Sequence, residues 1–466
     1  MKKIRFYLTG LSLLLLTAVY SCREESDSVM SYEYAPNDTS NFVEASSSFE
    51  GQFKAIWTAM SCNYPIWDYE EQFGLDWNDV YNRYLPIFRA LDERACMSHD
   101  SVTNSELEAL YSEILSPLHD GHFYASIKNL HNDSLVFVQP LDIRNKASRP
   151  DYQDSQDISS KYYQSATDGE LLMEEFDESK ILFETIIEYG SFKDGIVFLR
   201  LSSQCLTEMM TNEFPSDSEL DSSLGENAVL SKLYKDAALK TKEVWRKWYY
   251  QIQALHGKGM LKGVIIDLRN NLGGDSADYQ YVIGALQAPD AVSGKLNAKV
   301  HQNGMLRVKS GIGQRDYLPM TPWYFPIYPE EHAVIEHEPI VVLANGHTAS
   351  MAEHLCLAAK LMANGRIIGT QTMGAFSPLA ESNTNESVYP LTYAGSVGDK
   401  PFLGLLSETP FYLNIPFAAF FTNDGKILES IGIEPDIKVE FDNELYESTG
   451  RDNQLERALE FIRTGK

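Results

Sequence analysis

Apolar residues between about residues 47 and 122 recur at three- and four-residue steps, the spacing that places side chains on one face of a helix. The clearest run consists of Leu107, Leu110, Ile114, Leu115 and Leu118. Asp76, just before Trp77, is a residue type that favours helix starts, and we expect it to cap one. The pattern predicts a helical N-terminal region over residues 47–127.

From residue 195 the pattern changes to short apolar runs alternating with helical periodicity. Residues 195–201 read as a strand, and apolar positions between residues 230 and 252 predict a long amphipathic helix. Short, β-branched runs follow at 264–268, 340–343 and 366–369. Strands that alternate with helices are typical of an α/β fold with a largely parallel sheet, and we assign it to residues 191–445.

Two segments flank this predicted core. Residues 128–190 are acidic and weakly periodic, and we treat them as a connecting segment without assigning a fold. Residues 446–466 predict a C-terminal helix, with Leu455, Leu459 and Ile462 on its apolar face.

The start of the chain has the composition of an export signal. Lys2, Lys3 and Arg5 precede an apolar run that is too short to span a bilayer comfortably. The run ends in Ser21-Cys22, which resembles a bacterial lipobox, although an ordinary signal peptide cut beside a cysteine is the alternative. We therefore expect residues 1–21 to be a signal peptide, Cys22 to carry lipid and residues 22–46 to form a polar tether. The mature protein would then be anchored to the outer membrane of a bacterial cell envelope, facing the periplasm or the surface.

Composition excludes several classes of protein. The chain has 466 residues, of which 44% are hydrophobic and 23% charged, as in ordinary globular proteins. Acidic residues outnumber basic ones by 66 to 39, giving a net charge of −27, which disfavours nucleic-acid binding. The other cysteines are widely spaced and form no C-x-x-C pair, so we expect neither a structural zinc site nor another cofactor. Disulfides and free thiols both remain open for Cys62, Cys96, Cys205 and Cys356.

Candidate chemistry lies where two predicted strands end, because sites of open α/β sheets gather at the carboxyl ends of strands. The first strand is followed by Gly273 and Gly274, whose backbone N–H groups could stabilise a developing anion, although a plain tight turn is the simpler interpretation. The second is followed by a turn and then Ser350 at a helix start, the arrangement that presents a hydroxyl nucleophile. Ser350 and Glu353 also have capping-box spacing, so Ser350 could simply cap the helix.

Taken together, these windows resemble the C-terminal processing and tricorn-like serine peptidases. The resemblance rests on Asp-Leu-Arg-Asn-Asn-Leu-Gly-Gly at 267–274 and Asn-Gly-His-Thr-Ala-Ser-Met-Ala-Glu at 345–353. It continues in Gly-Thr-Gln-Thr-Met-Gly at 369–374, in residues 424–437 and in Leu-His-Asp-Gly-His at 118–122. It implies a ClpP/crotonase-like α/β core, a peptide or protein substrate and Ser350 as the nucleophile. Residues 128–190 show no carboxylate-binding loop of the kind found in the family's PDZ domains.

The resemblance also implies how the serine is activated. The processing branch places a lysine where this chain has Ala375, so a Ser–Lys dyad is not preserved. The tricorn-like branch uses a histidine and a glutamate, which correspond to His122 and Glu429. The oxyanion hole would be formed by the N–H of Met351 and one from Gly273 or Gly274.

Other interpretations of these residues remain open. His122 could be a structural histidine in a turn, or it could bind a metal with His119, and His354 could approach Ser350 from the same helical face. Glu429 could be a solvated carboxylate at a strand end. The predicted function is that of an exported, lipid-anchored serine peptidase. A catalytically silent ligand- or peptide-binding lipoprotein on the same fold, or an esterase, is the alternative, and the sequence does not indicate an oligomeric state.

Overall fold

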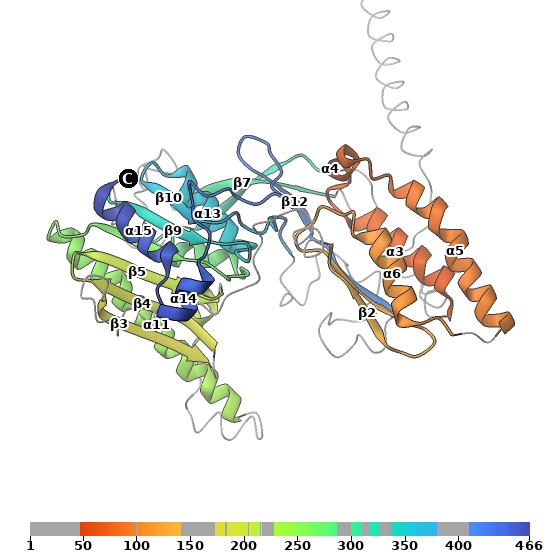
Figure 1. Ribbon diagram of the computed structural model, residues 1–466, viewed down its shortest axis with the longest axis horizontal. Coiled ribbons are helices and arrows are strands. Elements are labelled where there is room, and N and C mark those ends of the chain that lie inside the picture. The colour runs from red at the N-terminus through yellow and green to blue at the C-terminus, as the bar shows by residue number, and fades with distance from the viewer. Residues whose placement is uncertain are drawn as a thin grey trace, which may run out of the picture.

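The structure is a computed structural model, and its fold is shown in Figure 1. It describes residues 47–98, 101–140, 173–181, 184–203, 205–214, 216, 228–286, 300–309, 317–326, 335, 337–379 and 410–466. The predicted signal peptide, tether and Cys22 lie outside these residues, so they stay predictions. None of the helices in these ranges has the length and apolar character that crossing a membrane requires.

The N-terminal part packs helices against one face of a small antiparallel sheet (Figure 1). Its helices are α3 (Phe49–Asn63), α4 (Trp67–Glu70), η1 (Glu71–Phe73), α5 (Trp77–Ser98) and α6 (Asn104–Leu115). Its strands, in the order β11-β1-β2, are β1 (Tyr124–Lys128), β2 (Leu135–Val138) and β11 (Phe411–Asn414). Alternate strand residues such as Ala125 and Val136 are buried in one hydrophobic core with the helices. The helical N-terminal region is therefore confirmed, and a late segment of the chain completes its sheet.

Side-chain caps fix where the N-terminal helices begin. The Ser48 hydroxyl accepts a hydrogen bond from the Gly51 N–H at 2.9 Å, and Ser48 has the extended backbone usual for a cap. Asp76 Oδ1 accepts the N–H of Asn78 at 2.8 Å, which agrees with its predicted capping role. These caps satisfy backbone N–H groups that have no partner within the helix.

The core is built on a seven-stranded sheet in the order β13-β10-β9-β6-β5-β4-β3. Its strands are β3 (Met173–Ile181), β4 (Glu184–Phe192), β5 (Ile196–Leu201), β6 (Gly263–Asp267), β9 (Ile340–Ala344), β10 (Gly365–Gly369) and β13 (Ile437–Lys438). Every neighbouring pair from β13 to β5 is parallel, whereas β4 and β3 are antiparallel. The predicted α/β fold with a largely parallel sheet is confirmed.

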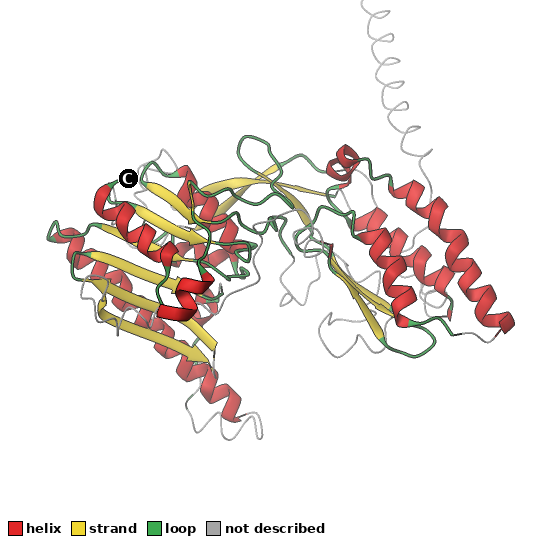
Figure 2. Ribbon diagram, viewed as in Figure 1, coloured by secondary structure: helices red, strands yellow, loops and turns green. Residues whose placement is uncertain are grey.

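Helices cover both faces of this sheet (Figure 2). The core helices are α9 (Leu206–Thr211), α11 (Ala228–Gly257), η3 (Ser276–Tyr281), α13 (Met351–Leu361), α14 (Asn443–Thr449) and α15 (Asn453–Thr464). Val264 and Ile266 of β6 share a hydrophobic cluster with α11 and α13. Ile265, which points to the other face, packs with α15. This two-sided burial explains why the strands read as continuous apolar runs.

A third sheet joins the two parts of the molecule. Its strands, in the order β12-β7-β8, are β7 (Val300–Val308), β8 (Thr321–Pro326) and β12 (Ala418–Phe421). Phe420 of β12 belongs to the hydrophobic cluster of the core, whereas its neighbours Ala419 and Phe421 belong to the N-terminal cluster. One short strand therefore packs against both parts.

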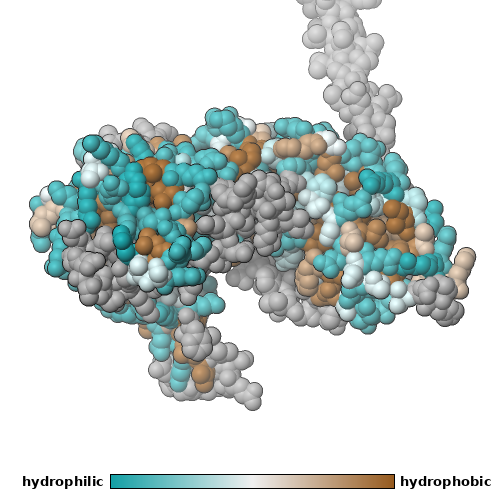
Figure 3. All heavy atoms as spheres, viewed as in Figure 1, coloured by the Kyte–Doolittle hydropathy of each residue, from teal (hydrophilic) through white to brown (hydrophobic). Residues whose placement is uncertain are grey.

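Two predicted boundaries differ from the structure. The core sheet begins with β3 at Met173, inside the segment that we treated as a connection before residue 191. β3 is an edge strand carrying several charged, partly exposed residues, so it lacks the apolar signal of a buried strand. The C-terminal helical segment starts at Asn443 of α14, just before the predicted residue 446, and α15 buries Leu455, Leu459 and Ile462 as expected. The face shown in Figure 3 is largely hydrophilic, in keeping with the charged composition.

Candidate active site

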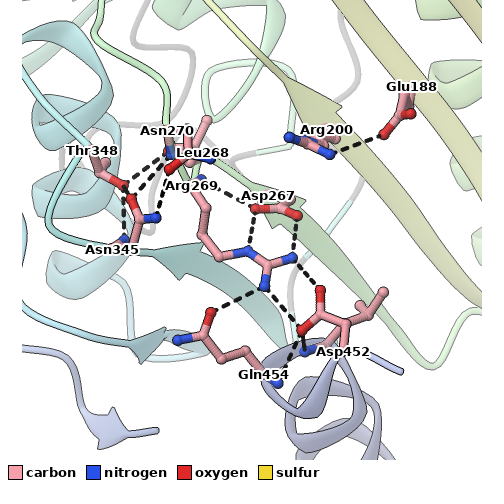
Figure 4. Close-up of polar contacts among 11 residues, drawn as sticks. Glu188, Arg200, Asp267, Leu268, Arg269, Asn270, Asn345, Thr348, Asp452 and Gln454 are labelled. Atoms are coloured by element: carbon pink, nitrogen blue, oxygen red, sulfur yellow. Dashed lines mark hydrogen bonds and ion pairs between the residues drawn. The ribbon is translucent and has the colours of Figure 1, made fainter. Parts of the chain in front are cut away.

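Two loops meet at the carboxyl ends of β6 and β9, because these strands are parallel neighbours in the sheet. The amide side chain of Asn345, in the loop after β9, binds Asn270 in the loop after β6 (Figure 4). Asn345 Oδ1 accepts the N–H of Asn270 at 3.0 Å, and Asn345 Nδ2 donates to Asn270 Oδ1 at 2.8 Å. The Thr348 hydroxyl donates to the carbonyl of Leu268 at 2.9 Å. The two windows singled out in the sequence therefore form one hydrogen-bonded unit.

A buried arginine anchors the first of these loops. The Arg269 guanidinium contacts both Asp267 and Asp452 at 2.6 Å and Gln454 at 3.0 Å (Figure 4). Burial raises the pKa of Asp267, but the charge and hydrogen bonds of Arg269 outweigh it and leave that pKa below its usual value. Since Asp452 also caps α15, this network joins the loop to the C-terminal helix.

Ser350 stands directly before α13 with an unusual backbone. Its φ is 54° and its ψ is −126°, a region that costs an L-residue roughly 1–3 kcal/mol. The ordinary caps Ser48 and Thr103 have φ of −150° and −81°. Capping alone therefore does not account for the conformation of Ser350, whereas a sharp strand–turn–helix that presents a nucleophile does. The residue is half-buried.

Gly273 lies against this serine. A Cβ atom at Gly273 would come within 2.6 Å of Ser350 Cβ and 2.7 Å of the Met351 nitrogen, so only glycine fits. The N–H of Gly273 already donates to Asn271 Oδ1 at 2.8 Å. Of the two glycines, Gly274 thus remains as the candidate oxyanion donor. Met351 is in the first helical turn, and no described residue accepts its N–H.

His122 is carried by a loop that contacts the core. The N–H of His122 donates to Asp120 Oδ1 at 2.8 Å, and the preceding Gly121 packs so closely on Ala375 that a Cβ atom would lie 2.3 Å from its Cα. The ring Nδ1 is buried without a hydrogen-bond partner. Burial lowers the pKa of His122 to about 4, although the backbone of Ser377 partly opposes this. The imidazole is therefore neutral at pH 7 and able to accept a proton.

Glu429 is fully buried, which overturns the interpretation of a solvated carboxylate. Its Oε2 accepts the N–H of Gly121 at 3.1 Å, and its Oε1 accepts the N–H groups of Phe376, at 2.9 Å, and Ser377. Burial raises the pKa of Glu429 to about 7. The carboxylate thus holds the backbone that precedes His122, rather than the imidazole itself.

One loop, residues 370–377 after β10, contacts the segments that carry three of the predicted site residues, and we name it the bridge loop. Glu429 and Gly121, next to His122, contact its C-terminal half. Glu353 of the Ser350 helix accepts hydrogen bonds from Thr372, Gly374 and Ala375 of the same loop. Among the described contacts, no hydrogen bond joins the His122 ring to the Ser350 hydroxyl; the bridge loop instead contacts Gly121, next to His122, and Glu353, on the helix that Ser350 begins.

Comparison with known proteins agrees with this geometry. The model of peptidase family S41 matches residues 234–439, which include Gly273, Ser350 and Glu429. Residues 234–439 belong to peptidase family S41. The family predicted from the sequence is thereby confirmed, and His122 lies before the matched S41 region.

Two relatives show how far the similarity extends. A carboxy-terminal-processing protease of Bartonella bacilliformis is 27% identical over 180 residues, which is 39% of this chain and 31% of the relative. The match thus spans about a third of the length of the curated relative. The crystal structure of a candidate peptidase from Parabacteroides merdae superposes with a TM-score of 0.52 at 18% identity, covering 89% of this chain and 97% of that one. At that identity the likeness shows a shared fold.

Within the S41 region, His354 is a structural residue. Its Nδ1 lies 2.8 Å from Asn303 Nδ2 and its Nε2 lies 3.1 Å from the carbonyl of Phe376. Both nitrogens are thus used by a neutral ring whose Nε2 carries the proton. Burial lowers the pKa of His354 to about 3. The contacts give no support to His354 as the base for Ser350.

The metal interpretation of His119 also finds no support. His119 Nδ1 pairs with the buried carboxylate of Glu70 at 2.8 Å, and its ring stacks on Phe73. In the part of the chain that the structure describes, no group of three or more His, Cys, Asp or Glu residues could hold a metal ion.

The packing around Ala375 explains why a small residue stands at this position. Its backbone and Cβ lie directly against Gly121, so the loop that carries His122 fills the space beside it. A lysine at position 375 would have to displace that loop. The sequence showed the missing lysine but not that the histidine segment lies beside this position.

Sequence reasoning missed the wider role of Glu353. We considered it only as part of a capping box, and its Oε2 does accept the Ser350 N–H at 3.2 Å. The same carboxylate also reaches the bridge loop. These contacts join Glu353 to Thr372, Gly374 and Ala375, about twenty residues later, and local sequence patterns do not relate positions that far apart.

Proposed function

We propose that the protein is an exported, lipid-anchored serine peptidase of the bacterial cell envelope, with Ser350 as its nucleophile. Peptides or proteins would be its substrates, and Cys22 would hold it at the outer membrane. Membership of family S41 supports the type of reaction. The observation that carries the proposal is the positive φ of Ser350 between a strand and a helix, with Gly273 packed against it.

In the proposed reaction, Ser350 Oγ attacks the carbonyl carbon of the scissile peptide bond while its proton passes to His122. The oxygen of the tetrahedral intermediate gains negative charge. The N–H groups of Met351 and Gly274 are the proposed donors to it, and the positive end of the α13 dipole favours the same charge. His122 then protonates the leaving amine, and water hydrolyses the acyl-enzyme by the same steps in reverse.

His122 has the protonation state that a general base needs. Its pKa of about 4 keeps it neutral at pH 7, and the unpartnered ring Nδ1 lies in a desolvated setting. Because no hydrogen bond joins its ring to the Ser350 hydroxyl in this structure, rotation of the two side chains on a fixed backbone would have to bring them into contact when substrate binds. Hydrogen bonds of this kind often tighten only in the substrate complex.

Glu429 supports this base indirectly. By accepting the N–H of Gly121, it fixes the residue next to His122 against the bridge loop. Its removal would leave three buried backbone donors without their acceptor.

The experiment compares Ser350→Ala with a cap that has no catalytic role. Ser48→Ala removes the hydroxyl that accepts the Gly51 N–H and should cost about 1 kcal/mol of stability while leaving hydrolysis unchanged. Ser350→Ala should remove peptide hydrolysis in a folded protein, down to the level set by binding and the oxyanion hole. Full activity in folded Ser350→Ala would contradict the assignment.

The same assay separates the alternatives. An esterase would cleave small acyl esters but no peptide, with the same dependence on Ser350. A silent binding protein would bind peptides and hydrolyse neither substrate. The missing contact between His122 and Ser350 is the observation that favours this second candidate.

A further inference from the structure

We propose that Glu353 is a positioning residue that fixes the strained backbone of Ser350 relative to the segment carrying His122. The inference rests on the proposed function, since it gives Glu353 a role in catalysis. Glu353 does so through the bridge loop, residues 370–377.

The Glu353 carboxylate accepts hydrogen bonds from two separate parts of the fold. From its own helix it accepts the N–H of Ser350 at 3.2 Å. From the bridge loop it accepts the N–H groups of Gly374, at 2.8 Å, and Ala375, at 2.7 Å, and the hydroxyl of Thr372, at 2.5 Å. Capping the helix needs only the first of these contacts, so the others join Ser350 to the loop.

The next two residues of the loop bind the other carboxylate. Phe376 and Ser377 donate their N–H groups to Glu429, which also accepts the N–H of Gly121. Four consecutive backbone donors are thus divided between two glutamates. A continuous path runs from the Ser350 N–H through Glu353, the loop and Glu429 to Gly121, the neighbour of His122.

Because the carboxyl groups of this path are buried, they require hydrogen-bond donors from the protein, and these bonds hold the path rigid. Glu353 and Glu429 are both fully buried, and no described lysine or arginine forms an ion pair with either. Their stabilisation therefore comes from the backbone and hydroxyl donors. A loop held by five hydrogen bonds to two buried carboxyl groups has little freedom to move relative to Ser350.

Packing adds a second constraint on the same loop. Gly374 has φ of 94°, and a Cβ atom there would lie 2.8 Å from the nitrogen of Ile431. Gly121 contacts Ala375 from the other side. Packing thus fixes the bridge loop in one position. Glu353, which accepts the N–H of Ser350, joins Ser350 to the loop in that position.

The test uses Glu353→Gln in the full chain. Glutamine keeps the shape but presents an NH₂ group to backbone donors, so at least one N–H loses its acceptor. A displacement of about 1 Å between reacting groups can lower a rate by about 100-fold. We expect kcat per folded molecule to fall by about that factor, with KM within about twofold of wild type.

Asp92→Asn is the matched control. Asp92 is another carboxylate that accepts two backbone N–H groups, those of Phe49 and Glu50, both at 2.9 Å, but it lies in the N-terminal helices. Because Asp92 has a purely structural role, Asp92→Asn should lower the melting temperature and leave kcat per folded molecule unchanged. Glu353→Asp, which keeps the charge, should recover part of the kcat lost in Glu353→Gln.

The outcomes separate this inference from the proposed function. If wild type hydrolyses peptides and Glu353→Gln has the same kcat per folded molecule, Glu353 only caps the helix and the inference is wrong while the function stands. If Glu353→Gln does not fold, Thr372→Val removes one donor to the same carboxylate and should lower kcat with KM unchanged; an unchanged kcat there also overturns the inference. If wild type neither hydrolyses peptides nor reacts with a fluorophosphonate, both fail.

Discussion

Replacing Gly273 by alanine probes the contact between the loop after β6 and Ser350, the proposed nucleophile. A Cβ atom at this position would lie 2.6 Å from Ser350 Cβ, 2.7 Å from the Met351 nitrogen and 2.9 Å from the carbonyl oxygen of Ala349. Two of these atoms belong to the backbone, which cannot rotate out of the way. The backbone around Ser350 must therefore shift.

The expected magnitude has two contributions. Gly273 has φ of 93°, and an L-residue held at such an angle costs about 1–3 kcal/mol. Overpacking of a well-filled site typically adds about 1–3 kcal/mol. A shift of about 1 Å in the nucleophile or its oxyanion donor would lower kcat by about 100-fold.

Gly425→Ala separates the two contributions. Gly425 has φ of 82°, but a Cβ atom there would meet nothing within 4 Å. This variant should show the conformational cost alone and keep full activity. The assay is kcat and KM for peptide hydrolysis, with melting temperatures for both variants. Equal kcat values for Gly273→Ala and Gly425→Ala would refute the proposed role of Ser350 and of the Gly273 contact with it.

Three further predictions concern the base, a buried carboxylate and the anchor. His122→Ala should abolish turnover, whereas His354→Gln, which keeps an N–H donor for the buried carbonyl of Phe376, should retain it; the reverse result in purified, folded variants would move the base to the helix that begins at Ser350. Burial raises the pKa of Glu353 from 4.5 to about 7, so the folded state binds this proton more tightly than the unfolded state, and the resulting stabilisation is present below pH 4.5 and lost as the pH rises to about 7. Wild type should accordingly lose about 3 kcal/mol relative to Glu353→Gln across that window, and denaturant unfolding that shows the opposite slope would contradict the burial argument. Cys22→Ala should release a soluble, folded protein, and an unmodified Cys22 in the mass of the mature N-terminus would exclude the lipid anchor.

The sequence allowed the two halves of the core site to be predicted because each follows a strand with a clear apolar pattern. β6 and β9 are neighbours in a parallel sheet, so the loops containing Gly273 and Ser350 had to meet. The same local signals predicted the helices of the N-terminal part and the apolar face of α15.

The contacts of the glutamates could not be predicted, because they depend on chain segments that meet only in the folded protein. Gly121 and Glu429 are 308 residues apart, and β1 pairs with β11 from the far end of the chain. Burial, which sets the pKa of His122 and Glu429, follows from this assembly and not from neighbouring residues. From sequence alone, Glu429 is a candidate catalytic carboxylate with a solvated strand end as the alternative, and Glu353 is a member of a capping box.

The antiparallel strands β3 and β4 were missed for a different reason. β3 is an edge strand with charged residues such as Glu174 and Asp177, and Asp177 pairs with Lys240 of α11 at 2.9 Å. An edge strand that is stabilised by charged side chains lacks the alternation of apolar and polar residues by which a strand is recognised in a sequence. The start of the core was therefore placed too late.

Covalent labelling with a fluorophosphonate tests the central claim most directly, because the reagent reacts with an activated serine and requires no knowledge of the substrate. The account predicts one adduct per chain, located by peptide mass mapping at Ser350 and absent from Ser350→Ala, with slower labelling in His122→Ala. Labelling at another serine, or a folded wild-type protein that stays unlabelled, would contradict it.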